Sequence, residues 1–126
     1  MKDYYGWRAR IGLIYIADST VMEPELYAMA PEGVAIHTTR IDLADPSLAG
    51  LGRMMEGDEV EEAARLLGLA PLHVVTFGGT SATFLEGIGF DQKVITRMES
   101  VLHGIPASTT STAALRALRA LGVKKI

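Results

Sequence analysis

The stretch Leu72–Ser81, "LHVVTFGGTS", sets the architecture of the chain, because an apolar run passes directly into two glycines and two hydroxyl residues. A short apolar run bounded by glycine is typical of a buried strand, and the glycines predict a tight turn into a following helix. In parallel sheets, ligands bind beyond the carboxyl ends of the strands. The turn from Gly78 to Ser81 is therefore the first candidate binding site.

Further apolar runs extend this pattern along the chain. They lie at Arg10–Ile16, Gly33–Thr39 and Ile105–Thr109, and Gly122–Ile126 has the composition of an opening fifth strand. Helical segments separate the runs, which predicts an α/β fold: a parallel sheet of four to five strands with helices on both faces. The runs at Arg10–Ile16 and Leu72–Phe77 are almost continuously apolar, which places them at the centre of the sheet.

Four segments between the runs carry helical patterns with start or stop signals. Pro24 is expected at the first position of the first helix, and Gly68 is expected to end the second. Asp91 and Ser111 are expected as the N-caps of the last two helices. The stretch from 41 to 55 has the least regular pattern. The last helix carries a leucine stripe at Leu115, Leu118 and Leu121.

Length and composition exclude several classes of protein. The 126 residues suit one domain with one core, so residues 1–126 are treated as a single α/β lobe. The formal net charge of −3 gives no reason to expect nucleic acid or a membrane surface as a partner. The absence of cysteine excludes disulfides and a cysteine nucleophile within this chain. No apolar run approaches the ~18 residues of a membrane span and no signal-peptide cleavage site follows the first run, which predicts a cytoplasmic protein.

Small polar residues follow three of the predicted strands, at Ala17–Thr20, Gly78–Ser81 and Ser108–Thr112. Because parallel strands end at one edge of a sheet, these turns are expected to meet there. None of them contains lysine or arginine, so a carboxylate is a more suitable ligand than a phosphate held by cations. Taken singly, each serine or threonine has helix capping as an alternative role. The histidines show no metal-binding spacing, so no metal is expected.

The end of the chain carries a further expectation. The sequence stops at Ile126, where a new strand is expected to begin. A compact domain seldom ends on an unpaired strand, because its free edge invites pairing with another chain. This favours a chain that is half of a larger assembly, completed by a second lobe or by a second copy in a homo-oligomer.

Three parts of the sequence resemble known families. "RIGLIYIADSTVMEPELYAMAPEGVAIHTTRI" (Arg10–Ile41) resembles the opening of the maleate cis–trans isomerase group. "VVTFGGTSATFLEGIGFD" (Val74–Asp91) and "GIPASTTSTAALRALRALGVKKI" (Gly104–Ile126) are similar to the middle of that group and of the arylmalonate decarboxylases. Both groups belong to the aspartate/glutamate racemase superfamily. The resemblance implies two similar α/β lobes with the active site between them, and this chain would be the first lobe.

The resemblance also implies roles for single residues. In the isomerases and racemases a cysteine matches Gly79, whereas the arylmalonate decarboxylases resemble this chain in having glycine there. Thr80 and Ser81 would be the catalytic residues that hold the carboxylate as it becomes an enediolate, without a cofactor. Gly78 and Gly79 would shape the turn. The other substrate-binding residues expected from the neighbouring turns are Ser19, Thr20 and Thr110.

One departure counts against maleate isomerase activity. The isomerase pattern reads Ser-Asn-Thr where this chain has Asp18, Ser19 and Thr20, and serine offers fewer donors than the family asparagine. The expected function is a cofactor-independent decarboxylase-like or cis–trans isomerase-like enzyme acting on a small carboxylic or dicarboxylic acid, such as a malonate or maleate. This chain alone is expected to be inactive, because it has no thiol to donate a proton. The alternatives are a catalytically silent carboxylate-binding or regulatory module, and a lobe with no function of its own.

Overall fold

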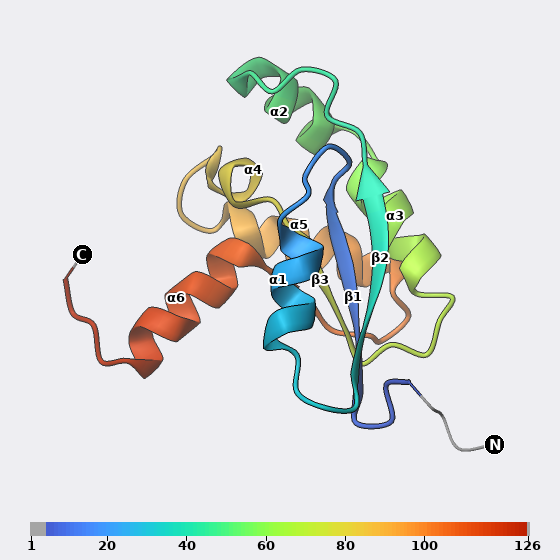
Figure 1. Cartoon of the computed structure of the whole chain (residues 1–126). Coiled ribbons are helices and arrows are strands. Elements are labelled where there is room, and N and C mark those ends of the chain that lie inside the picture. Colours follow the sequence, from blue (N-terminus) through green and yellow to red (C-terminus); the bar gives the residue numbers. More distant parts are fainter. Residues whose placement is uncertain (1–4, 126) are drawn as a thin grey trace.

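The protein is built on one parallel sheet of four strands in the order β2-β1-β3-β4 (Figure 1). The structure is a computed structural model and describes residues 5–125. The strands are β1 (Ala9–Ile16), β2 (Val34–Ile41), β3 (Val74–Gly78) and β4 (Ala107–Thr109). The two most apolar runs are the central strands, with Leu13 of β1 opposite Thr76 of β3. The predicted α/β fold with a parallel sheet is confirmed.

Six helices accompany the sheet within the described residues. They are α1 (Met22–Met29), α2 (Leu48–Glu56), α3 (Glu59–Leu67), α4 (Thr80–Phe84), α5 (Phe90–Val101) and α6 (Thr110–Ala120). Helix α1 covers one face, where it packs on Leu13 and Tyr15. Residues of α2 to α5 pack on the opposite face around Ile14, Val75 and Phe77. The prediction of helices on both faces is therefore confirmed.

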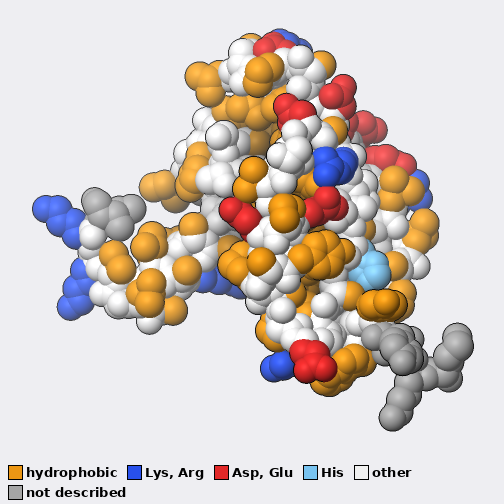
Figure 2. All heavy atoms as spheres, in the orientation of Figure 1, with side chains coloured by type: hydrophobic (Ala, Val, Ile, Leu, Met, Phe, Trp, Pro, Cys, Tyr) orange, Lys and Arg blue, Asp and Glu red, His pale blue; other side chains and the backbone are white. Residues whose placement is uncertain are grey.

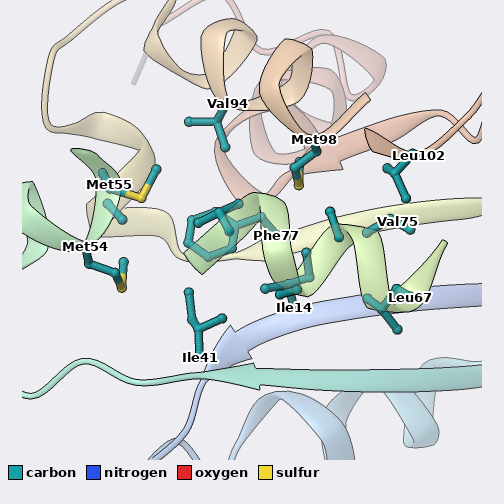
Figure 3. Packing of buried hydrophobic residues seen from close by; sticks show 14 of the residues in the cluster. Ile14, Ile41, Met54, Met55, Leu67, Val75, Phe77, Val94, Met98 and Leu102 are labelled. Carbon is teal, nitrogen blue, oxygen red and sulfur yellow. The ribbon is translucent and has the colours of Figure 1, made fainter. Parts of the chain in front are cut away.

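The larger core lies between β1, β3 and the helices α2 to α5. Alternation along β1 explains its position, because successive side chains of a strand point to opposite faces of the sheet. Leu13 and Tyr15 point to α1, whereas Ile14 points into the larger core, and all three are fully buried. Figure 3 shows Phe77 in the middle of this core, among side chains that include Met55 and Val94.

The expected fifth strand is wrong for the part of the chain that the structure describes. Gly122 belongs to a turn after α6, and residues 123–125 are irregular, while Ile126 lies outside the described residues. A strand needs a neighbour to satisfy its backbone groups. Helix α6 leads these residues away from the sheet, as Figure 1 shows, so they do not pair with the free edge of β4.

Both expected N-caps are also wrong. Gly89, with φ +90°, precedes α5, so Asp91 lies inside the first turn and its carboxylate accepts a hydrogen bond from Thr112. Thr109, not Ser111, caps α6, and its hydroxyl accepts a hydrogen bond from the backbone N–H of Thr112 at 3.2 Å. In both cases a tertiary partner uses the side chain that would otherwise cap the helix.

Of the other two helix signals, Pro24 was placed wrongly and Gly68 was placed correctly. Helix α1 begins at Met22, two residues before Pro24, which is therefore not at its first position. Proline is tolerated there because the N–H groups of the first helical turn have no acceptor within the helix. Gly68 ends α3 as expected.

The irregular stretch from 41 to 55 contains most of α2, which stands beyond the carboxyl ends of the strands (Figure 1). Ser47 caps this helix by accepting a hydrogen bond from the N–H of Gly50 at 3.1 Å. Met54 and Met55 anchor its second half in the core. The sequence pattern did not define this helix, because two glycines interrupt it.

Helix α6 contacts the rest of the fold mainly through its first turn. Its buried residues are Ser111 and Thr112, whereas Leu115 and Leu121 of the leucine stripe are 48% and 79% exposed. In Figure 2 the projecting helix shows apolar side chains on its surface. Among residues 5–125, no helix has the length and apolar character needed to cross a membrane.

Candidate functional site

The turn after β3 opens into a cavity of about 360 Å³ at the carboxyl edge of the sheet. Gly78, Gly79, Thr80 and Ser81 form one side of it, and the two hydroxyl residues are exposed. The opposite wall is apolar and includes Leu51 of α2. The remaining lining residues are Ile16, Leu43, Pro46 and Ala82. This volume falls in the range of about 300–1,000 Å³ that is usual for small-molecule sites.

A hydrogen bond joins this turn to the next strand end. Thr80 Oγ1 lies 3.1 Å from Thr110 Oγ1. Either hydroxyl can act as the donor, because hydroxyl hydrogens rotate to suit their partners. When Thr110 donates, the hydrogen of Thr80 is available for a ligand in the cavity. The structure therefore brings together five of the expected site residues: Gly78, Gly79, Thr80, Ser81 and Thr110.

Thr83 stabilises the turn through hydrogen bonds to its backbone. Its hydroxyl lies 3.0 Å from the carbonyl oxygen of Gly79 and 3.1 Å from that of Thr80. Its side chain also bonds to the hydroxyl of Ser111. Because the one hydrogen of Thr83 is directed at the two carbonyls, Ser111 is the donor in that bond. A buried hydroxyl pair thus holds the backbone of the turn against the start of α6.

A second polar cluster fixes the start of α6 against α5. The Thr112 hydroxyl donates to the Asp91 carboxylate, which holds the pKa of that carboxyl below its usual range. The Thr109 hydroxyl donates to that of Thr112 at 3.1 Å. Within residues 5–125, the serine and threonine side chains that are buried all belong to this region: Thr83, Thr109, Ser111 and Thr112. Each of these buried hydroxyls has a hydrogen-bond partner, as buried polar groups need. The network therefore stabilises the turn and the start of α6.

Ser19 and Thr20 follow β1. The residue of β1 that lines the cavity is Ile16. The turn after β1 is held by Arg40 of β2. Its guanidinium donates to the carbonyl oxygens of Ala17 at 2.6 Å and Ser19 at 3.1 Å. Their expected role in substrate binding stays a prediction.

Arg40 belongs to a polar cluster between β1, β2 and α1. It stacks on the ring of Tyr15, with its central carbon 4.5 Å from the ring centre, and donates to Glu23 at 2.9 Å. The Tyr15 hydroxyl is buried without an ideally aligned partner, and Glu23 is the carboxylate beside it. Interactions with Tyr15 first, then with Thr38 and Arg40, lower the pKa of Glu23 to about 2. This cluster fixes α1 and the adjoining turn.

The apolar wall of the cavity depends on Arg97 of α5. Its guanidinium donates to the carboxylate of Glu61 and to the carbonyl oxygens of Met55 and Gly57, the latter at 2.5 Å. These bonds hold the junction between α2 and α3. They therefore position Leu51 and the rest of α2 opposite the turn.

The site offers neutral donors and no charged clamp. Its hydroxyls come from Thr80, Ser81 and Thr110, and the sequence contains no thiol. Among residues 5–125, no three histidine or carboxylate side chains are grouped as metal ligands. Such a turn can hold a carboxylate and stabilise charge that develops on it.

Sequence reasoning missed the supporting residues Thr83, Ser111 and Thr112. For Thr83 a local signal existed, because it follows Thr80 by three residues on the same helical face. The pairing of Asp91 with Thr112 had no local signal, since it joins two helices that are distant in sequence. The same holds for Leu51, because the sequence pattern did not define α2 as a helix.

Comparisons with known proteins agree with this geometry. A family model described as arylmalonate decarboxylase matches residues 11–126. The arylmalonate decarboxylase of Bordetella bronchiseptica is 38% identical over 69 residues, which make up 55% of this chain and 28% of that protein.

Solved structures show the same fold. A variant of the maleate isomerase Iso from Pseudomonas putida S16, determined with maleate, gives a TM-score of 0.80 at 26% identity, over 90% of this chain and 49% of that chain. A crystal structure of arylmalonate decarboxylase gives a TM-score of 0.72 at 28% identity, over 90% of this chain and 46% of that one. The chain thus spans about half the length of these relatives. The expected likeness to the racemase superfamily is confirmed, and by the match of nearly its whole length this chain belongs to the arylmalonate decarboxylase family.

Proposed function

We propose that the turn from Gly78 to Ser81 binds the carboxylate of a small carboxylic or dicarboxylic acid, in the first lobe of a cofactor-independent decarboxylase-like or isomerase-like enzyme. The observation that carries this proposal is the pair of exposed hydroxyls at Thr80 and Ser81, which open into the cavity above a buried layer of partners. Membership of a decarboxylase family supports the same reading.

The chemistry follows from where charge develops. When a malonate loses carbon dioxide, the electron pair of the broken C–C bond moves into the remaining carboxyl group and gives an enediolate. Donors already aimed at that group stabilise the added charge without rearranging. Thr80 donates to one oxygen while it accepts from Thr110, and Ser81 donates from the next position. The absence of a side chain at Gly79 leaves this step without a covalent intermediate on the turn.

The proton that completes the reaction comes from outside this chain. The enediolate carbon needs an acid beside it, and the 126 residues contain no cysteine. We therefore place the proton donor on a second lobe and expect the isolated chain to bind its ligand without turnover. The expected cytoplasmic location also stays a prediction.

The substrate class follows from the two walls of the cavity. One wall offers hydroxyls, and the other offers Ile16, Leu43 and Leu51. A malonate with an apolar substituent matches both, since its carboxylate would meet the turn and its substituent the leucines. Maleate, which was bound to the isomerase relative, is the second candidate.

A catalytically silent carboxylate-binding or regulatory module is the second candidate function. Gly79 and the absence of cysteine favour it, because both remove chemistry while leaving the donors of the turn in place. Both functions bind a small carboxylate, but only the enzyme converts it to product.

The second lobe, from the same polypeptide or from another copy, is the proposed partner. Exposed apolar side chains at the end of α4, on the α4–α5 loop and on α6 support it, because contiguous exposed apolar patches mark interaction sites. These side chains are Phe84, Ile88, Leu115 and Leu121. Sedimentation of the chain with and without Leu115→Glu tests this surface: loss of self-association in the variant supports a second copy, and a monomer in both cases supports a separate lobe.

Turnover by the natural gene product tests the proposed function. Carbon dioxide release from substituted malonates and isomerisation of maleate are measured for the wild type and for Thr80→Val and Ser81→Ala. Removal of one such donor is expected to lower kcat by about 100-fold. Thr96→Val is the matched control, because the Thr96 hydroxyl is exposed on α5 and bonds to the carbonyl oxygen of Gln92, outside the lining of the cavity. Unchanged kcat in Thr80→Val and Ser81→Ala would contradict the proposal, and binding without turnover would favour the silent module.

A further inference from the structure

Position 79 lacks a side chain for a reason of space. The backbone of Gly79 has φ −138°, a negative value that residues with side chains also adopt. A Cβ atom placed there would lie 2.5 Å from Cζ and 2.6 Å from Cε1 of Phe77. Both distances are shorter than real Cβ contacts, so a side chain at this position requires the ring to move.

The ring has little room to move. Phe77 is fully buried, and Figure 3 shows it in the middle of the larger core. Side chains from several helices and strands surround it, including Ile14 and Ile41 from the sheet and Met55 and Val94 from the helices. Because protein interiors are close-packed, displacing such a ring forces other side chains out of their preferred positions.

We propose that Phe77 determines the chemistry of the turn by excluding any side chain, and thus any nucleophile, from position 79. This inference rests on the proposed function of the turn as a carboxylate-binding loop. Phe77 does not touch the ligand, so it is a positioning residue that acts through Gly79. The turn then works through the hydrogen bonds of Thr80 and Ser81 alone. A cysteine at position 79, as in the related isomerases and racemases, requires a smaller residue at position 77.

A double-mutant cycle in thermal stability tests this coupling. The variants are Gly79→Cys, Phe77→Leu and the two combined. Gly79→Cys alone is expected to lower Tm by about 4 to 12 °C, as for an overpacked core in a domain of this size. In the double variant the fall in Tm should be clearly smaller than the sum of the single falls, because leucine vacates the space. Gly79→Ala repeats the cycle with a smaller side chain, in case the cysteine variant fails to fold.

Gly52→Cys is the matched control. A Cβ atom on Gly52 meets nothing within 4 Å, so its effect on Tm should be the same with phenylalanine or leucine at position 77. Because residues 1–126 contain no cysteine, each cysteine variant also carries a single thiol that reports its own surroundings.

Alkylation of that thiol gives a readout that packing alone would not move. Iodoacetate carries a carboxylate and iodoacetamide does not, so the ratio of their rates measures attraction of a carboxylate to the turn. In Phe77→Leu/Gly79→Cys this ratio should exceed that of Gly52→Cys several-fold across the pH range in which the thiol ionises.

The two readouts separate the two claims. Additive falls in Tm at positions 77 and 79 would overturn the inference about Phe77, whatever the alkylation ratio. Non-additive falls with a raised ratio support both claims. Non-additive falls with an ordinary ratio support the role of Phe77 and count against carboxylate binding by the turn.

Discussion

Thr83→Val tests whether the buried hydroxyl layer supports the candidate site. Valine keeps the shape of threonine and replaces its hydroxyl with a methyl group. Thr83 is 1% exposed, and its hydroxyl serves the carbonyl oxygens of Gly79 and Thr80 while it accepts from Ser111. The variant therefore loses a hydrogen bond and leaves the Ser111 hydroxyl buried without its acceptor.

The magnitude follows from these contacts. A net hydrogen bond contributes about 0.5–1.5 kcal/mol, and an unsatisfied buried donor costs about 1–3 kcal/mol. We expect Thr83→Val to lower the free energy of unfolding by about 2 kcal/mol, which corresponds to a fall in Tm of roughly 8 °C. Thr83→Val/Ser111→Ala should be less destabilised than the sum of its single variants, because it removes the orphaned donor as well.

Urea denaturation followed by far-UV circular dichroism measures this change. The midpoint should fall with an unchanged slope, since the variant alters stability and not the surface exposed on unfolding. Thr96→Val is the control, because Thr96 also donates to the carbonyl four residues earlier, Gln92, but is exposed to water. Its effect should stay within about 0.5 kcal/mol. An equally small effect of Thr83→Val would refute the structural role of the hydroxyl layer.

Two further predictions concern the supports on either side of the site. Glu23→Gln should lower the free energy of unfolding at pH 7, because the pKa of Glu23 is lowered to about 2 in the folded protein and the charged carboxylate therefore stabilises the fold above its ordinary pKa. The difference in stability between variant and wild type should shrink as pH falls from 4.5 towards 2. A difference that does not change with pH would contradict this. Arg97→Lys keeps the positive charge but loses the guanidinium that bonds to Glu61 and to two backbone carbonyls. Amide hydrogen exchange in α2 should therefore become faster, while β1 stays protected. Unchanged protection of α2 would show that other contacts hold it.

The parts of the fold that sequence predicted correctly depend on local signals. The central strands are long apolar runs, and the turn at Gly78 combines glycine with hydroxyl residues that end a strand. Both patterns constrain the backbone whatever surrounds it. Thr80, Ser81 and Thr110 came together for the further reason that parallel strands end at one edge.

The errors arise where a distant partner decides the role of a side chain. Asp91 and Ser111 have the chemistry of N-caps, but Thr112 and Thr83 respectively engage their side chains in the folded chain. Arg40 likewise holds the turn after β1 through the carbonyl of Ser19, a long-range contact that the local sequence does not indicate.

Helix α6 shows a different limit. Its leucine stripe marks an apolar face correctly, but a pattern does not say what covers that face. Leu115 and Leu121 remain exposed within residues 5–125. The same limit applies to α2, whose place over the site is set by Arg97 and by the buried Met54 and Met55.

Carboxylate binding at the turn is the central claim, and a titration of the ¹⁵N-labelled chain tests it most directly. Amide signals are followed while maleate or an arylmalonate is added at constant pH and ionic strength, with the neutral diester of each acid as the control. We predict saturable shifts centred on Gly79, Thr80, Ser81 and Thr110 with the acids and no shifts with the diesters. Shifts that are absent, spread over the surface, or equal for acids and diesters would contradict the account.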